Sequence, residues 1–294
     1  MRARMAFTIL QQVVNGVALG MLLALMAVGL TVVLGLMRVI NMAHGALYTL
    51  GAYTVVTTFD RWGFLPSLLA APIAVGVIGL VLEGVLIRPI YQRDPLHTLL
   101  LTFGLALIAE DLVRIVWGDA PYPMSPPELL SGILLLGDLP FSKYRLFVIV
   151  VSAALMLLTW MFLARTQLGR TVLAGTFDRE MVRVLGIRIN LLFTLVFGLG
   201  AALAGLAGAL ASPIRGVFPG MGSSIIMPSF VVVIIGGMGS FGGALIGGLS
   251  VGIIISLAVE FFPAASDVVV FVLLALVLLV RPRGLFGVEG LLSR

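Results

Sequence analysis

Long, nearly uninterrupted apolar runs dominate the chain. A helix needs about 20 apolar residues to cross the hydrocarbon core of a membrane. Runs of roughly that length or longer lie at about 7–35, 39–58, 65–87, 97–117, 145–164, 191–212, 225–262 and 265–280. Because the apolar residues are continuous rather than alternating, they predict helices and not barrel strands. We expect an all-α, polytopic transmembrane helical bundle with about eight spans, forming a single domain over residues 1–294.

The run at 225–262 is too long for one span, and Gly236-Gly237-Met238-Gly239 interrupts it. We therefore predict two helical pieces, 225–235 and 241–262, with non-helical backbone between them. Such backbone persists at membrane depth only where protein or a water-filled cavity satisfies its polar groups. A broken or re-entrant helix of this kind could line a route that opens and closes, which makes Gly236, Gly237, Gly239 and Ser240 candidate translocation-pathway residues.

A second polar interruption lies at 38–45 and contains Arg38, Asn41, His44 and Gly45. One interpretation is a cytoplasmic turn capped by Asn41. The other is a helix break whose polar groups support irregular backbone near the pathway. On the second interpretation Asn41, His44 and Gly45 are also pathway candidates.

Small residues recur at four-residue spacing, a pattern that lets helix backbones approach closely in lipid. The pairs are Gly16/Gly20, Gly239/Gly243, Gly243/Gly247 and Gly248/Gly252. Tight internal packing is the favoured explanation of any single pair, and a bendable pathway lining is the alternative.

Composition excludes several classes of protein. The chain is 61% hydrophobic and only 11% charged, with a mean hydropathy of +1.20, whereas soluble domains carry about 25% charged residues. It has no Cys and two His, His44 and His97, which lie far apart, so we expect no catalytic residues and no metal site. The one Lys, Lys143, is outside any phosphate-binding loop pattern. The Arg residues are scattered between apolar runs, which does not indicate nucleic-acid binding.

The Arg distribution predicts the orientation of the chain, since cytoplasmic loops are rich in Lys and Arg. The segment 165–190 holds five Arg, and 281–283 holds two, so we place both in the cytoplasm of a bacterial-type cell membrane. The loop at 118–144 is acidic and Pro-rich and is expected outside. Alternation from there leaves Arg2 and Arg4 outside, against the same rule.

The cytoplasmic segment contains a short helix, predicted from Arg170 to Leu185 and closed by Gly186. Leu173, Phe177 and Val184 can share its apolar face. Such a helix could lie passively on the membrane surface or dock into a groove of a partner, and periodicity does not choose between them.

Several stretches of the chain together resemble a known family. They are GLTVVLGLMRVINMAHGALYTLGAY (29–53), RPIYQRDPLHTLLLTFGLALIAEDLVRIVWG (88–118), GRTVLAGTFDREMVRVLGI (169–187), GGMGSFGGALIGG (236–248) and RPRGLFG (281–287). In this order they are similar to the permease subunits of ABC importers for branched-chain amino acids, and specifically to the H-type subunit.

The resemblance implies that 169–187 is the coupling helix, which sits in a cleft of an ATP-hydrolysing subunit. The residues that match the pattern of that loop are Gly169, Arg170, Ala174, Asp178, Glu180, Leu185 and Gly186. Members often carry Ala where Met181 and Val182 stand here. The family also implies two cytoplasmic ATPase subunits that bind ATP and Mg, a second homologous permease, and an extracytoplasmic solute-binding protein. This chain would bind no cofactor of its own and would move solute by alternating access.

Three other functions stay open at this stage. Relatives of the family move urea and other small solutes. A stand-alone secondary transporter would need coupling-ion carboxylates at the midplane. The spans instead show Glu83 near Arg88, and Glu110 four residues before Arg114, which are expected to be local ion pairs. A membrane enzyme would need a nucleophile, a metal cluster or an acid–base pair.

Overall fold

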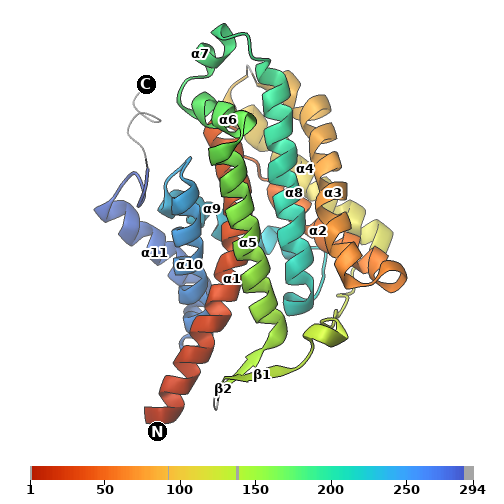
Figure 1. Cartoon of the computed structure of the whole chain (residues 1–294), viewed down its shortest axis with the longest axis vertical. Helices are drawn as coiled ribbons and strands as arrows, with labels where there is room; N and C mark the ends of the chain where they lie inside the picture. Colours follow the sequence, from red (N-terminus) through yellow and green to blue (C-terminus); the bar gives the residue numbers. More distant parts are fainter. Residues whose placement is uncertain (1, 92, 137–138, 288–294) are drawn as a thin grey trace.

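The computed structural model describes residues 2–91, 93–136 and 139–287. Within them, long helices run side by side along one axis (Figure 1). The α-helices are α1 (Arg2–Met37), α2 (His44–Trp62), α3 (Phe64–Leu82), α4 (Pro95–Trp117), α5 (Lys143–Arg165), α6 (Gln167–Phe177), α7 (Arg179–Val184), α8 (Ile189–Arg215), α9 (Met221–Gly236), α10 (Phe241–Phe261) and α11 (Ser266–Val280). A π-helical turn (Glu83–Ile87) and a 3-10 turn (Arg88–Ile90) extend α3.

The helices confirm a polytopic membrane bundle. In the described residues, six helices are long and apolar enough to cross a membrane: α1, α3 with its extension, α5, α8, α10, and α11 with the preceding turn. The helices α2 and α4, of 19 and 23 residues, lie among them. The 16-residue α9 is shorter. The prediction of about eight spans with one interrupted helix is therefore consistent with this arrangement.

The two ends of the bundle differ. The short helices α6 and α7 lie at one end, and the start of α1 lies at the other, together with a hairpin of β1 (Ile133–Leu136) and β2 (Leu139–Ser142) (Figure 1). We call these the α6–α7 end and the hairpin end. The hairpin was not predicted. Its position opposite α6 and α7 agrees with the expected alternation of the loops.

Small residues bring the central helix α1 against α10. A Cβ added to Gly20 would lie 2.8 Å from the Leu249 Cα, and one added to Gly16 would lie 2.5 Å from the Ile253 Cα. The backbones therefore touch directly, as the four-residue spacing predicts. The opposite side of α1 packs against α8, where Gly29 faces Gly200. Residues 22–28 of α1 are buried on all sides.

The predicted helix from Arg170 to Leu185 is wrong in one respect, because it is divided in two. Asp178 has an extended backbone (φ −146°, ψ 101°), ends α6, and caps α7 through a 2.9 Å hydrogen bond that its carboxylate accepts from the Met181 N–H. An Asp side chain satisfies a free N–H at a helix start better than it serves a helix interior. The predicted stop at Gly186 is confirmed, since its φ is +81°.

Residues 38–43 form a break inside the bundle rather than a turn at its edge. Arg38 takes a left-handed backbone (φ +53°). The chain then turns back along α1, so that the His44 ring lies beside Gly29. Gly29 lies eight residues before the end of α1, a depth of about 12 Å at the helical rise. The helix α2 therefore begins within the bundle, and the interpretation as a simple capped turn is wrong.

Candidate functional site

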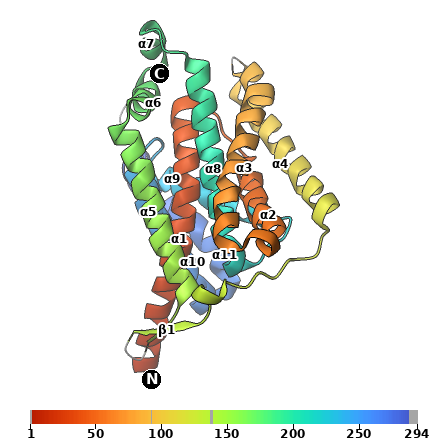
Figure 2. The same ribbon diagram turned by 45° about the vertical axis from the view of Figure 1, so that its right-hand side comes forward.

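The helix α6 lies at the end of α5, and α7 extends beyond the start of α8 (Figure 2). The Thr166 hydroxyl caps α6 by accepting a hydrogen bond from the Gly169 N–H at 3.0 Å. Gly169 is buried against the last turn of α5, where a Cβ would collide with the backbone of Phe162 and Leu163. The role of Gly169 is thus to let the chain reverse tightly from α5 into α6.

The surface of α6 and α7 is apolar and exposed. Its large apolar side chains with the most accessible surface are Phe177 (68%), Met181 (57%), Val184 (81%) and Leu185 (70%), with Leu173 beside them at 38%. The neighbouring residues Arg170, Ala174, Asp178, Glu180 and Arg183 are also exposed. Large exposed apolar patches rimmed by charge mark interaction surfaces. Of the predicted coupling residues, all but the buried Gly169 are therefore accessible to a partner.

The inner side of α6 and the predicted helix break both lie next to α1. Gly35 of α1 lies between them: a Cβ added there would be 3.5 Å from the Thr176 methyl group of α6 and 3.4 Å from the Gly239 Cα. A small cavity of about 20 Å³ is lined by Val172, Thr176 and Gly239 together with residues of α1 and α5. α6 and Gly239 therefore share one neighbour, Gly35, and one small cavity.

The break itself lies between α9 and α10, as predicted. Gly237 and Gly239 have φ of +96° and +84°, which only glycine adopts without strain. The Ser240 hydroxyl caps α10 by accepting from the Gly243 N–H at 3.0 Å. Gly236 packs directly on Gly243. The four predicted residues thus form one compact turn at the α6–α7 end.

The C-terminal stretch 281–287 completes this turn. The Leu285 N–H donates to the Ile235 carbonyl at 2.7 Å, and the Phe286 N–H donates to the Gly236 carbonyl at 3.1 Å. The last carbonyls of a helix have no partner within it, so this segment caps α9 from outside. Two of the stretches that carry the family resemblance are therefore parts of one local structure, a relation that sequence reasoning did not find.

The other predicted pathway residues divide between two environments. Asn41 and His44 are fully buried, and neither side chain has a hydrogen-bond partner in the described residues by ordinary geometry, although the Met26 backbone lies near the His44 ring. Gly45 faces Gly222 of α9 and lines a cavity. The structure does not bring Asn41 and His44 to the 236–240 turn.

The irregular backbone at 38–43 is supported by a neighbouring helix and not by its own side chains. The Thr102 hydroxyl of α4 accepts from the Met42 N–H at 3.2 Å and lies 3.1 Å from the Ile40 carbonyl, to which it can donate. Thr102 is fully buried. This is the satisfaction by surrounding protein that non-helical backbone requires in a membrane.

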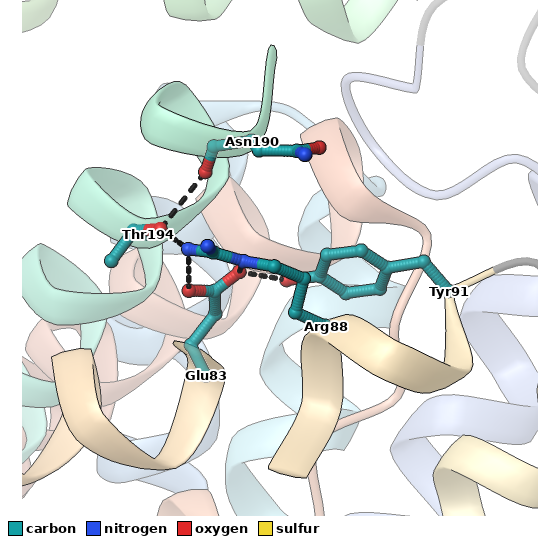
Figure 3. Close-up of polar contacts among 5 residues, drawn as sticks. All are labelled: Glu83, Arg88, Tyr91, Asn190 and Thr194. Carbon is teal, nitrogen blue, oxygen red and sulfur yellow. Dashed lines mark hydrogen bonds and ion pairs between the residues drawn. The ribbon is translucent and has the colours of Figure 1, made fainter. Parts of the chain in front are cut away.

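A polar network joins the end of α3 to the start of α8 near the α6–α7 end (Figure 3). The buried Glu83 carboxylate accepts from Arg88 at 3.0 Å and from the Tyr91 hydroxyl at 2.6 Å, and Arg88 also donates to the Thr194 hydroxyl. Burial, and then the hydrogen bond to Glu83, raise the pKa of Tyr91, so the phenol remains a proton donor. The Glu83–Arg88 pair was predicted, whereas Tyr91 and Thr194 were not.

The accessible face of α9 was also missed by sequence reasoning. Ser223, Ser224 and Met227 are exposed along its first half. On one side, a cavity of about 180 Å³ lies between α9, α2 and α4, where the Glu110 carboxylate accepts from the Ser223 hydroxyl at 2.8 Å. On the other side, a cavity of about 350 Å³ lies toward α11. Met227 lines both cavities.

The described residues hold no group of three or more His, Asp or Glu side chains placed to bind a metal ion. The ion pair between Arg114 and Glu110 is the predicted one, at 2.7 Å. The candidate site is a set of helix breaks, small-residue contacts and cavities.

Comparison with known proteins places these features in a family. Residues 12–280 match the family model described as the permease component of branched-chain amino acid transport systems. The chain is 33% identical to the high-affinity branched-chain amino acid transport permease protein BraD of Pseudomonas aeruginosa and to LivH of Escherichia coli, over 95% of each chain in both cases. It is 27% identical to the fructose import permease protein FrcC of Rhizobium meliloti, over 73% of this chain and 61% of that protein.

Proposed function

This chain belongs to the family of permease components of branched-chain amino acid transport systems, and we propose that it imports branched-chain or similar small hydrophobic amino acids as the H-type transmembrane subunit of an ABC importer. It is a transporter subunit and not an enzyme. The identity over nearly the whole length of BraD and LivH carries the choice of solute.

The coupling role rests on one structural observation. The exposed apolar surface of α6 and α7 lies outside the bundle, and the inner side of α6 contacts the turn at Gly239 through Gly35. A partner bound to that surface would move α6 and, through it, the junction of α9 and α10. The partner would be an ATPase subunit in the cytoplasm, one of two that bind ATP and Mg.

The remaining partners follow from the same proposal. A second, homologous permease would complete the translocation route, and an extracytoplasmic binding protein would deliver the solute at the hairpin end. The α6–α7 end would then face the cytoplasm of a bacterial cell with the chain in its inner membrane, as the Arg-rich segment 165–190 indicates. Alternating access would be a population shift driven by the different affinities of the partners for the two states.

A sugar is the second candidate solute, because FrcC is named as a fructose permease. FrcC has a lower identity and a shorter coverage than BraD and LivH, so a sugar is a weaker candidate than a branched-chain amino acid. The uptake assay below separates the two candidate solutes by measuring whether excess fructose inhibits leucine uptake.

The Asp178→Ala variant tests the coupling role. Loss of an Asp cap costs about 1 kcal/mol, enough to fray the six-residue α7. We expect ATP-dependent leucine uptake into proteoliposomes holding the whole transporter to fall about fivefold, since a tenfold change corresponds to roughly 1.4 kcal/mol, while insertion of the chain is unchanged. Arg170→Ala should lower uptake for a different reason, the loss of an exposed charge on the docking surface.

Asp94→Ala is the matched control. The Asp94 carboxylate caps α4 by accepting a 2.8 Å hydrogen bond from the Leu96 N–H. The substitution therefore removes the same kind of cap from a helix outside the docking surface. We expect nearly normal uptake from Asp94→Ala. Full uptake by the Asp178→Ala, Arg170→Ala double variant would refute the coupling role of this segment.

A further inference from the structure

The cavity between α9 and α11 contains two opposite charges that do not pair with each other. Its lining includes Arg215 from the end of α8 and Asp267 from the first turn of α11. Within the described residues no ion pair joins them, and Asp267 has no ion pair or hydrogen bond. Arg215 interacts electrostatically with the buried Tyr48 hydroxyl. A cation and an anion, both exposed, thus line one cavity without pairing with each other.

Two hydroxyl groups in the same cavity are oriented as acceptors. The Ser224 hydroxyl donates its proton to the Met221 carbonyl at 2.8 Å, and the Ser266 hydroxyl donates to the Pro263 carbonyl at 2.9 Å. With their protons engaged, both oxygens present lone pairs to a ligand. An ammonium group, which has three donors and no acceptor, suits them together with Asp267.

The rest of the lining is apolar. Ile225 and Met227 of α9, Ile255 of α10, and Val270 and Phe271 of α11 contribute to it. The volume of about 350 Å³ is near the lower end of the range of small-molecule sites, about 300 to 1,000 Å³. The cavity therefore places a guanidinium, a carboxylate, two hydroxyl oxygens and an apolar wall around a space suited to a small ligand.

We propose that this cavity is a binding site for the free zwitterionic amino acid as it enters the permease at the hairpin end. Arg215 binds the α-carboxylate, in the two-point geometry that a guanidinium offers. Asp267, with the Ser224 and Ser266 oxygens, binds the α-ammonium group. The α10 and α11 side chains contact the branched apolar side chain. The site deepens the proposed function and rests on it for the identity of the solute.

The absence of native Cys allows a direct test by a single introduced thiol. In membranes holding the complete transporter, the Ser224→Cys thiol is alkylated with a small polar reagent while millimolar L-leucine is present or absent. We expect leucine to slow this alkylation several-fold. The amine 3-methylbutylamine and the acid 4-methylpentanoate, each lacking one charge of the zwitterion, should protect much less.

Ser223→Cys is the matched control, because Ser223 is the adjacent residue of α9 but faces the cavity beside Glu110. Leucine should leave the rate of its alkylation unchanged. Adding Arg215→Gln to Ser224→Cys should abolish the protection.

Transport supplies an independent measurement. We expect Arg215→Gln and Asp267→Asn each to raise the KM for leucine uptake about tenfold, the usual effect of losing one hydrogen bond to a charged group. Asp60→Asn and Arg61→Gln remove exposed charges from the hairpin end outside the cavity and should leave KM unchanged.

The outcomes distinguish failure of the proposed binding site from failure of the proposed function. Normal leucine uptake without protection of the Ser224→Cys thiol, or with unchanged KM in Arg215→Gln and Asp267→Asn, would overturn the site and leave the proposed function intact. A transporter that imports a different solute and no amino acid would overturn both. Protection confined to Ser224→Cys, together with raised KM, supports the site.

Discussion

Glu83 illustrates how one residue determines its surroundings. Its carboxylate is fully buried at the end of α3, and an isolated buried charge would be very costly. In an ordinary α-helix, side chains three or four residues apart are neighbours, but Arg88 is five residues away. The π-helical turn at Glu83–Ile87, in which the Arg88 N–H bonds to the Glu83 carbonyl, brings the pair together.

Removing the cation should harm stability more than removing the anion. Arg88→Gln leaves a buried carboxylate held by Tyr91 alone, whereas Glu83→Gln leaves an Arg88 side chain that is 38% exposed. We expect Arg88→Gln to lower the free energy of unfolding by about 2 kcal/mol, since Arg88 is partly solvated and the full penalty for a buried pair is about 3–5 kcal/mol. Glu83→Gln should cost less than half as much.

Denaturant or thermal unfolding in detergent micelles measures the difference. Arg114→Gln serves as the control, because it breaks ion pairs of a solvated Arg with Glu110, Asp111 and Asp119, each worth less than about 1 kcal/mol. Equal destabilisation by Arg88→Gln and Arg114→Gln would contradict the importance of burial at Glu83.

At the scale of elements, two interruptions of helices organise the bundle. The break at 38–43 allows α2 to start inside the bundle, and the turn at 236–240 joins α9 to α10 beside α6. The first is supported by Thr102 of α4 and the second by the backbone of Leu285 and Phe286. Each break thus depends on a segment remote in the sequence, as irregular backbone in a membrane must.

Gly239→Leu should block transport. The residue has φ of +84° and lies against Gly35, so a side chain would strain the backbone by roughly 1–2 kcal/mol and separate α6 from the turn. We expect uptake of leucine by the reconstituted transporter to fall to background.

Gly118→Leu is the control for backbone strain alone. Gly118 has a similar φ of +87°, but nothing lies within 4 Å of an added Cβ. We expect it to reduce stability slightly and to retain uptake. Wild-type uptake by Gly239→Leu would contradict the assignment of this turn to the translocation mechanism.

At the scale of the whole molecule, we propose that the chain depends on partner subunits for the energy of transport. Its single Lys lies outside any phosphate-binding loop pattern, and ATP is proposed to act through partners at the α6–α7 surface. The cavities on both sides of Met227 lie on the face of α9 that the bundle leaves accessible.

The purified chain alone should therefore hydrolyse no ATP above background. Addition of the two ATPase subunits and the second permease should produce ATPase activity, and solute-loaded binding protein should stimulate it. Phosphate release in detergent or nanodiscs measures both states. ATP hydrolysis by the lone chain that persists after repurification would contradict the proposed division of labour.

The sequence by itself determined the membrane class, the approximate spans, the Gly236–Ser240 break and the small-residue positions where helix backbones approach closely. These follow from apolar length, glycine content and four-residue spacing, which act locally along a helix. The family resemblance added the position of the coupling segment.

Only the tertiary structure decided which distant segments meet. It joined 281–287 to the end of α9, placed Thr102 against the break at 38–43, divided the coupling segment at Asp178, and put Arg215 and Asp267 into one cavity. Such pairings depend on how whole helices pack across the bundle. The hydrophobic pattern of a membrane helix shows that it is embedded in lipid or protein, but not which helix is its neighbour, because lipid and protein interiors are similarly apolar.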